Sequence, residues 1–151
     1  MPEKETIRRA QQDKRKGKAP STQAGEFVKE EMDHIRQGKH GARSTKQAIA
    51  IGLSKARRAG VDLPPPEKGA VSERTRTRAA RDRAKGQTAT AQRPSTTRSQ
   101  AASKALKREG KSAASRTALA RQARTSARVR GASKRRAAAR KAARTRRASH
   151  S

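Results

Sequence analysis

The chain has 151 residues, of which 41 are Lys or Arg and 12 are Asp or Glu, so its formal net charge at pH 7 is +29. Only 30% of its residues are hydrophobic and one, Phe27, is aromatic, which predicts extensive disorder around a small core. The sequence contains no cysteine, and this excludes disulfides, thiolate metal sites and a cysteine nucleophile.

The amino-terminal residues 1–24 are polar and contain the basic run KRKGK. They have too few large apolar residues to offset the entropy cost of ordering, so we expect a disordered basic arm. This segment lacks the apolar region of a secretory signal, and no part of the chain approaches the roughly 18 apolar residues of a membrane span. We therefore expect a soluble, cytoplasmic protein.

The first predicted helix covers about residues 25–37. Val28, Met32 and Ile35 recur at helical spacing and form one apolar stripe. Gly38 follows the last apolar residue and is expected to end the helix.

The second predicted helix covers about residues 45–59. Ser44 and Gln47 have the spacing of a capping box, in which Ser44 accepts a hydrogen bond from the Gln47 amide while the Gln47 side chain reaches back. Gly52 lies within this helix, where it would permit a close approach of the first helix. Gly60 is the expected stop.

The predicted fold is mostly α with extensive disorder. A short helical hairpin over residues 25–63 is followed by a proline-rich spacer over residues 64–71. Residues 72–85 are charged and partly helical in this prediction, and residues 86–100 form a Ser/Thr linker. Residues 101–151 form a low-complexity Ala/Arg/Lys tail that becomes helical on binding its ligand.

The charge is distributed unevenly along the chain. Residues 83–151 contain 21 of the 41 Lys and Arg but one acid, Glu109. Because such a segment repels itself, it favours a polyanionic partner, and nucleic acid is the most abundant one. Arg exceeds Lys in the tail, which suits bidentate contacts to phosphate. Since only one residue of the chain is aromatic, aromatic platforms for base stacking are not expected, and duplex DNA is favoured over single strands.

Residues 26–66 contain a Gly-Lys-His-Gly turn followed by the run STKQAIAIGLSKARRAG. This segment resembles a small bacterial domain family with that signature, whose activity is not established. The resemblance implies a bacterial source and a helical module and supplies no catalytic residues. The Ala/Arg/Lys tail is similar in composition to the tails of linker-histone-like bacterial proteins.

The candidate nucleic-acid ligands are basic residues of the turn, of the second helix and of the tail. We expect the turn and the amino end of the second helix to hold a phosphate. The candidates are Lys39, His40, Arg43, Lys46, Lys55, Arg57, Arg58, Arg121, Arg124, Arg128, Arg130, Lys134, Arg135, Arg136, Arg140, Lys141, Arg144, Arg146 and Arg147.

Two other kinds of site are disfavoured by the sequence. His34 and His40 lie near Glu30 and Glu31, but their spacing matches no known ligand motif, so we interpret them as surface or capping histidines. The adjacent acids Glu30 and Glu31 do not face one another on a helix, which disfavours paired acid–base catalysis. We predict no metal, no cofactor and no enzymatic activity.

The favoured function is that of a nucleoid-associated, histone-like protein that binds DNA through its phosphates without sequence specificity. An RNA- or ribosome-associated protein uses the same charge and remains open as an alternative. A third alternative is a protein-interaction module, in which the apolar stripe of residues 25–63 binds a protein partner or a second copy of the chain and the tail is an electrostatic tether.

Overall fold

The computed structural model describes residues 1–88, 95–148 and 150. Within these residues, the regular structure is entirely helical, with six α-helices in place of the predicted two-helix hairpin. The predicted extensive disorder is wrong, because helices cover most of the described chain. The elements are α1 Lys4–Arg15, α2 Pro20–Arg36, α3 Thr45–Arg58, α4 Glu73–Gln87, α5 Thr96–Lys107, the short 3-10 helix η1 Ser112–Ala114, and α6 Arg116–Ala148.

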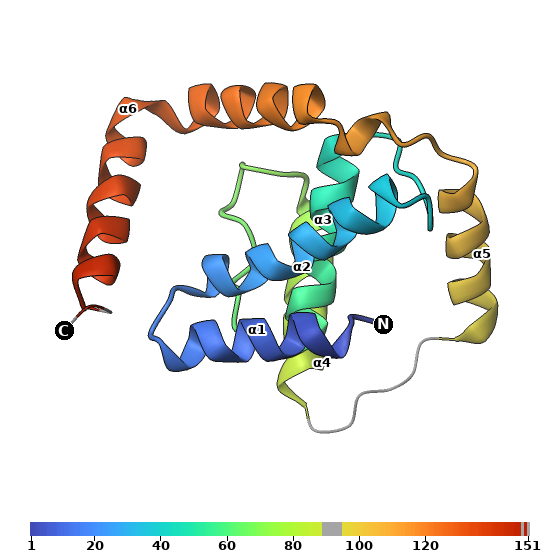
Figure 1. Cartoon of the computed structure of the whole chain (residues 1–151), viewed down its shortest axis with the longest axis horizontal. Coiled ribbons are helices and arrows are strands. Elements are labelled where there is room, and N and C mark those ends of the chain that lie inside the picture. The colour runs from blue at the N-terminus through green and yellow to red at the C-terminus, as the bar shows by residue number, and fades with distance from the viewer. Residues whose placement is uncertain (89–94, 149, 151) are drawn as a thin grey trace.

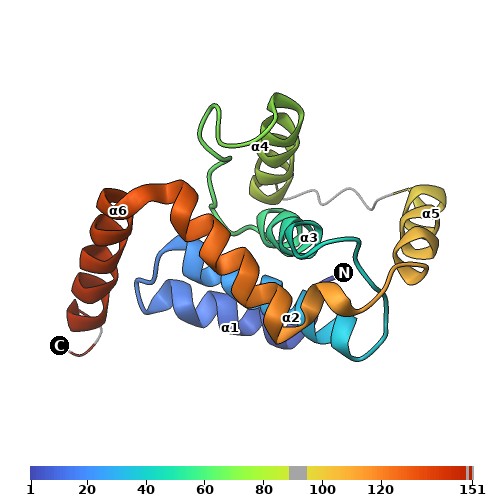
Figure 2. The same ribbon diagram turned by 90° about the horizontal axis from the view of Figure 1, so that it is seen from above.

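The helices α1 to α4 form the body of the molecule. Helices α1 and α2 lie side by side, α3 crosses them, and α4 packs on the other side of α3 (Figures 1 and 2). Helix α5 stands apart from this body, and α6 runs along one end of it before it turns sharply away (Figure 1).

The expected disordered arm over residues 1–24 instead forms α1 and the start of α2. Ile7 and Ala10 of α1 pack in a core cluster with Phe27. The prediction failed because these two apolar residues are too few to form a recognisable stripe, and their burial depends on a neighbouring helix. Helix α2 begins at Pro20, since proline suits the first turn of a helix, where its missing N–H is not needed.

The predicted second helix is confirmed in detail. Ser44 accepts a hydrogen bond from the Gln47 amide at 3.1 Å, while the Gln47 side chain reaches back to the amide of Arg43 at 2.7 Å. Helix α3 ends at Arg58, and Gly60 adopts a φ of 96° just beyond it. Local sequence therefore accounts for both ends of this helix.

Gly52 permits a close approach of α2 and α3, as predicted. A Cβ atom at Gly52 would lie 2.7 Å from the Cα of Val28, which is a backbone atom and cannot rotate away. Any larger residue at this position must push the two helices apart.

Gly52→Ala should therefore lower the free energy of unfolding by roughly 1–3 kcal/mol, because the added methyl group overpacks the α2–α3 interface. Gly25→Ala is the matched control, since Gly25 is a helical glycine whose added Cβ would contact nothing within 4 Å. That control should stabilise the protein by about 0.5–1 kcal/mol. Urea unfolding followed by circular dichroism measures both changes; a stabilising Gly52→Ala would show that the helices do not touch here.

A second core cluster joins the tail to the hairpin. Ala113 and Ala114 are buried beside Met32 and Ile35 of α2, and Leu119 of α6 packs against them. The expected disorder around the hairpin is thus wrong for this part of the tail. Small alanine side chains bury little area, but they allow the tail backbone to lie close to the hairpin.

Two backbone hydrogen bonds connect the turn after α2 to the tail. The amide of Gly41 donates to the carbonyl of Leu106 at 2.8 Å, and the amide of Ala42 donates to that of Gly110 at 3.1 Å. A Cβ at Gly41 would overlap the carbonyl of Glu109, so glycine is required for this contact. The tail is therefore attached to the hairpin well before α6 begins.

Helix α4 is held against α3 by one acid. Asp82 is buried, and its carboxylate accepts hydrogen bonds from the Ser54 hydroxyl at 2.7 Å and from Nε of Arg58 at 2.8 Å. The charged segment predicted to be partly helical is thus an ordered helix. The linker expected over residues 86–100 is also shorter than predicted, because α4 extends to Gln87 and α5 begins at Thr96; residues 89–94 lie outside the described part of the chain.

The low-complexity tail is helical without a ligand, which corrects the expectation that residues 101–151 order only on binding. Ala, Arg and Lys are strong helix formers, and their propensities outweigh like-charge repulsion of a few tenths of a kcal/mol per pair. Gly131 interrupts α6 with a φ of 72° and a ψ of 166°. This left-handed conformation suits glycine and produces the sharp turn between the two parts of the helix (Figure 1).

Candidate nucleic-acid interface

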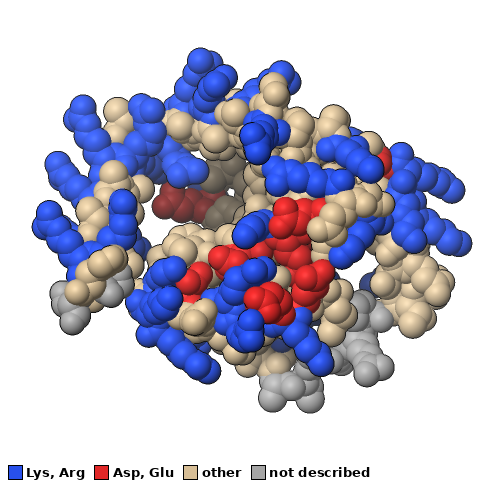
Figure 3. Space-filling model, in the orientation of Figure 1, with Lys and Arg blue, Asp and Glu red and all other residues tan. Residues whose placement is uncertain are grey.

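The most basic element of the structure is α6. Its 33 residues include 13 Lys and Arg, 11 of them Arg, but no Asp or Glu and no buried side chain. Figure 3 shows acidic side chains near the centre of one face, over the region of α1 and α2, while Lys and Arg line the margins along α5 and both parts of α6. Helix α6 therefore presents a surface of one sign of charge.

The start of α6 is fixed in place by α2 and α3. The buried hydroxyl of Thr45, at the beginning of α3, donates to the carbonyl of Ala113 at 2.7 Å. Nε of Arg36, at the end of α2, donates to the carbonyl of Ala114 at 3.0 Å. These contacts satisfy the carbonyls of η1, so the direction in which α6 leaves the body is set by the hairpin.

The amino ends of α3 and α6 face one open cleft. Ser44 caps α3, and the hydroxyl of Ser115 caps α6 by accepting from a backbone amide of its first turn at 3.1 Å. Arg43, Lys46 and Arg121 are exposed and border this cleft. Among the described residues none of these three bases forms an ion pair with an acid.

This cleft combines two sources of positive potential. The first turns of two helices place unpaired amides and the positive ends of their dipoles toward the same space. Three basic side chains add full charges around them. The sequence predicted Arg43 and Lys46 at the start of a helix and Arg121 in the tail, but nothing in it indicated that these residues meet.

Other predicted ligands are engaged within the protein. Nζ of Lys39 lies 3.3 Å from Oε1 of Glu3, and Nζ of Lys55 lies 2.6 Å from Oε2 of the buried Glu31. Nε2 of His40 contacts the other oxygen of Glu31 at 2.8 Å. These three side chains are directed toward acids rather than toward the cleft, so we leave them out of the proposed interface.

The two arginines at the end of α3 also have structural contacts. Arg57 is buried and donates to the carbonyls of Leu63 and Pro64, each at 3.2 Å, which holds the chain beyond α3. Burial lowers the pKa of the Arg57 guanidinium from its ordinary value, and nearby Asp82 opposes this effect. Arg58 forms the ion pair with Asp82 described above. We leave these two residues out as well.

The second part of α6, beyond Gly131, extends the basic surface away from the body. One of its bases, Lys134, has an exposed ion pair with Glu67 at 3.5 Å. The bases along the whole helix are Arg116, Arg121, Arg124, Arg128, Arg130, Lys134, Arg135, Arg136, Arg140, Lys141, Arg144, Arg146 and Arg147.

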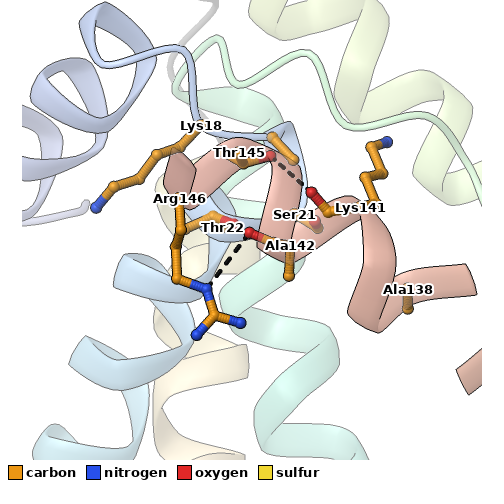
Figure 4. Close-up of a pocket in the computed structure, with 9 residues that line it drawn as sticks. Lys18, Ser21, Thr22, Ala138, Lys141, Ala142, Thr145 and Arg146 are labelled. Atoms are coloured by element: carbon orange, nitrogen blue, oxygen red, sulfur yellow. Dashed lines mark hydrogen bonds between the residues drawn. The ribbon is translucent and has the colours of Figure 1, made fainter. Parts of the chain in front are cut away.

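A second cleft separates this part of α6 from the amino end of α2. Ser21 and Thr22 line it from α2, and Lys141 and Arg146 line it from α6 (Figure 4). Nε of Arg146 is directed to the backbone of its own helix, where it donates to a carbonyl at 3.4 Å (Figure 4). Helix α2 begins here without a side-chain cap, and the amides of Thr22 and Gln23 donate to the carbonyl of Ala19 at 2.9 and 3.2 Å.

The hairpin at the centre of this surface is the part of the chain that comparisons with known proteins detect. Residues 14–68 match the model of a family of unknown function, DUF6496. The match covers little more than a third of the chain: it includes α2, the turn and α3 and ends before α4. It overlaps the segment in which the sequence resembles a bacterial domain family, and the tail lies outside it.

Neither a search of curated proteins nor a search of solved structures finds a match to this chain. Within the residues that the structure describes, no helix is long and apolar enough to cross a membrane.

Proposed function

We propose that this protein binds duplex DNA through its phosphates, without sequence specificity, and acts as a nucleoid-associated, histone-like protein. The observation that carries the proposal is α6, a helix with 13 bases, no acid and no buried side chain. A helix of 33 residues that is neither apolar enough for a core nor balanced in charge needs a polyanion as its partner.

The geometry of α6 suits the DNA backbone better than base edges. The turn at Gly131 divides the helix into two parts, residues 116–130 and 132–148, which at about 1.5 Å per residue are each roughly 20–25 Å long. Its bases occur on several sides of the helix rather than on one face. A binding surface of this kind contacts phosphates along a duplex and supplies no fixed pattern for reading sequence.

The cleft at the amino ends of α3 and α6 provides a defined phosphate contact within this surface. Arg43, Lys46 and Arg121 surround it, and backbone amides of both helices face it. A phosphate held there would anchor the hairpin to the backbone, while α6 follows the duplex.

Duplex binding is favoured over single-strand binding by the position of Phe27. It is the one aromatic residue of the chain, and it is 1% exposed in the core. Stacking of unpaired bases requires exposed aromatic rings, which this protein does not supply. Structured RNA offers the same phosphate chemistry as duplex DNA, and the experiment below distinguishes the two.

The proposal is tested by salt-titrated binding of the full chain to duplex DNA and to structured RNA. If about ten phosphates are contacted, log K should fall against log salt with a slope of about −9. A shallow slope of about −2 would contradict a phosphate-directed mechanism. A clear preference for RNA would assign the protein to the RNA- or ribosome-associated class.

The same assay tests the cleft. The triple variant Arg43→Gln, Lys46→Gln, Arg121→Gln should reduce the steepness of the slope by about 3, because each phosphate contact contributes about 0.9. The matched control removes three exposed bases elsewhere in the molecule, on α1, α2 and α4: Arg8→Gln, Lys29→Gln and Arg78→Gln. It has the same net charge and should change the slope by less than about 1; equal effects of the two triples would show that charge alone matters and that the cleft is not a contact.

A further inference from the structure

A cluster of two histidines and a buried acid lies where α2 meets the turn that follows it. Glu31 is fully buried, whereas His34 and His40 are each about one-sixth exposed or less at their side chains. Glu31 and His34 are three positions apart in the sequence and so lie on the same face of α2. Each of the three offers one donor atom, and these atoms all lie within 4.8 Å of one another.

The orientation of His40 is set by the backbone. Its Nδ1 lies 2.9 Å from the carbonyl oxygen of Gly41, which can only accept a hydrogen bond, so Nδ1 carries a proton. Its Nε2 lies 2.8 Å from Oε1 of Glu31. In a neutral imidazole, this arrangement directs the lone pair of Nε2 at a carboxylate oxygen. Either a proton between the two atoms or a metal ion bound by both of them would remove this repulsion.

The carboxylate of Glu31 is prepared for a ligand on one oxygen. Oε2 is paired with Nζ of Lys55 at 2.6 Å, which orients the group. Oε1 is buried and has Nε2 of His40 as its neighbour at 2.8 Å, while Oε1 of the adjacent Glu30 is buried without a hydrogen-bond partner among the described residues. A histidine that donates one nitrogen to a backbone carbonyl, together with a carboxylate held by a neighbouring side chain, is the usual environment of metal ligands.

The surroundings of His34 add a further carboxylate. Its Nε2 lies 2.9 Å from Oε1 of Glu3 and 3.9 Å from Oε1 of Glu30. The hydrogen bond with His34 lowers the pKa of the Glu3 carboxyl, and Lys39 adds to this effect. An ion pair between Glu31 and a protonated His40 would account for the His40 contact. It would leave unexplained why a donor atom of His34 also lies within 4.8 Å of those of Glu31 and His40. It would also leave unexplained why Oε1 of Glu30, 3.9 Å from Nε2 of His34, is buried without a hydrogen-bond partner among the described residues.

We propose that Glu31, His34 and His40 bind one Zn²⁺ or a similar divalent transition-metal ion. Two imidazole nitrogens and one carboxylate oxygen form a common zinc ligand set and leave a fourth position for water or another carboxylate. The ion would fasten the turn over residues 38–43 to α2, and through Lys55 to α3. This site is independent of the nucleic-acid interface, because none of its three ligands borders the cleft at the amino ends of α3 and α6.

Isothermal titration of the full, metal-free chain with Zn²⁺ tests the proposal. We expect one ion per chain with a dissociation constant in the micromolar range or lower, and Co²⁺ should give the d–d absorption of a four-coordinate site. His34→Ala and His40→Ala should each weaken binding by at least about tenfold. The matched control is His150→Ala, which removes the third histidine of the sequence and should leave binding unchanged.

Several results would overturn the proposal. One is the absence of saturable binding by the full chain at micromolar Zn²⁺, which would leave a simple ion pair between Glu31 and protonated His40. Another is binding that survives both substitutions. A third is binding that depends on His150. Should the variants fail to fold, chemical modification of the unaltered chain by diethyl pyrocarbonate provides the readout. Zn²⁺ should protect His34 and His40 and leave His150 reactive; equal reactivity of all three with and without the ion would refute the site.

Discussion

Replacing the bases in the second part of α6 by glutamine should weaken binding to duplex DNA by at least about a hundredfold near physiological salt. It should also remove most of the salt dependence, because up to eight phosphate contacts are lost at about 0.9 each. Glutamine is about as strong a helix former as Arg and Lys, so α6 should remain helical by circular dichroism. The eight positions are Lys134, Arg135, Arg136, Arg140, Lys141, Arg144, Arg146 and Arg147.

The control for this experiment retains the charge. Changing the six arginines of this set to lysine should preserve the salt slope, since counterion release depends on charge, while any loss of affinity would measure the contribution of bidentate arginine contacts. If the glutamine variant binds DNA as the unaltered chain does, the second part of α6 has no role in binding and the proposed interface must be confined to the body of the molecule.

Phe27→Ala should lower the free energy of unfolding by about 3–5 kcal/mol. Phe27 is the largest fully buried side chain and the centre of the cluster that joins α1, α2 and α3. Its removal leaves a cavity that the small surrounding side chains cannot fill. Because small domains are stable by only about 5–15 kcal/mol, the Phe27→Ala variant should be only marginally folded at physiological temperature.

Val129→Ala is the control for Phe27, because Val129 on α6 is 83% exposed. This change should alter stability by no more than about 0.5 kcal/mol. Thermal and urea unfolding of both variants give the comparison. A loss of less than about 1 kcal/mol for Phe27→Ala would mean that α1 is not packed on the hairpin.

The features predicted best from the sequence are those with short-range causes. The cap at Ser44, the end of α3 near Gly60 and the close approach at Gly52 all follow from residues near each other in the chain, or from the absence of a side chain. The two predicted helices differ from the observed ones mainly at the start of α2. The sequence predicts a start at about residue 25, whereas the helix begins at Pro20.

The features predicted worst are those that depend on partners distant in sequence. The only apolar residues of α1 are Ile7 and Ala10, and they pack in a cluster with Phe27 of α2. The sequence predicts a tail that is disordered without its ligand, yet Ala113 and Ala114 of the tail are buried against α2, and the backbone at Gly41 accommodates its approach. Composition measures how much apolar area is available, but it does not show how closely alanine and glycine let two backbones pack.

The residues of the candidate site also divide into those predicted from local sequence and those brought together by long-range packing. The sequence by itself determined the polycationic character of residues 83–151 and the basic start of the second helix, because charge and helix capping are properties of nearby residues. Only the tertiary structure decided that Arg121 meets Arg43 and Lys46, that Lys55 and Arg58 pair with acids, and that His34 and His40 converge on Glu31. These contacts result from the packing of α2, α3 and η1, whose geometry depends on long-range burial rather than on local pattern.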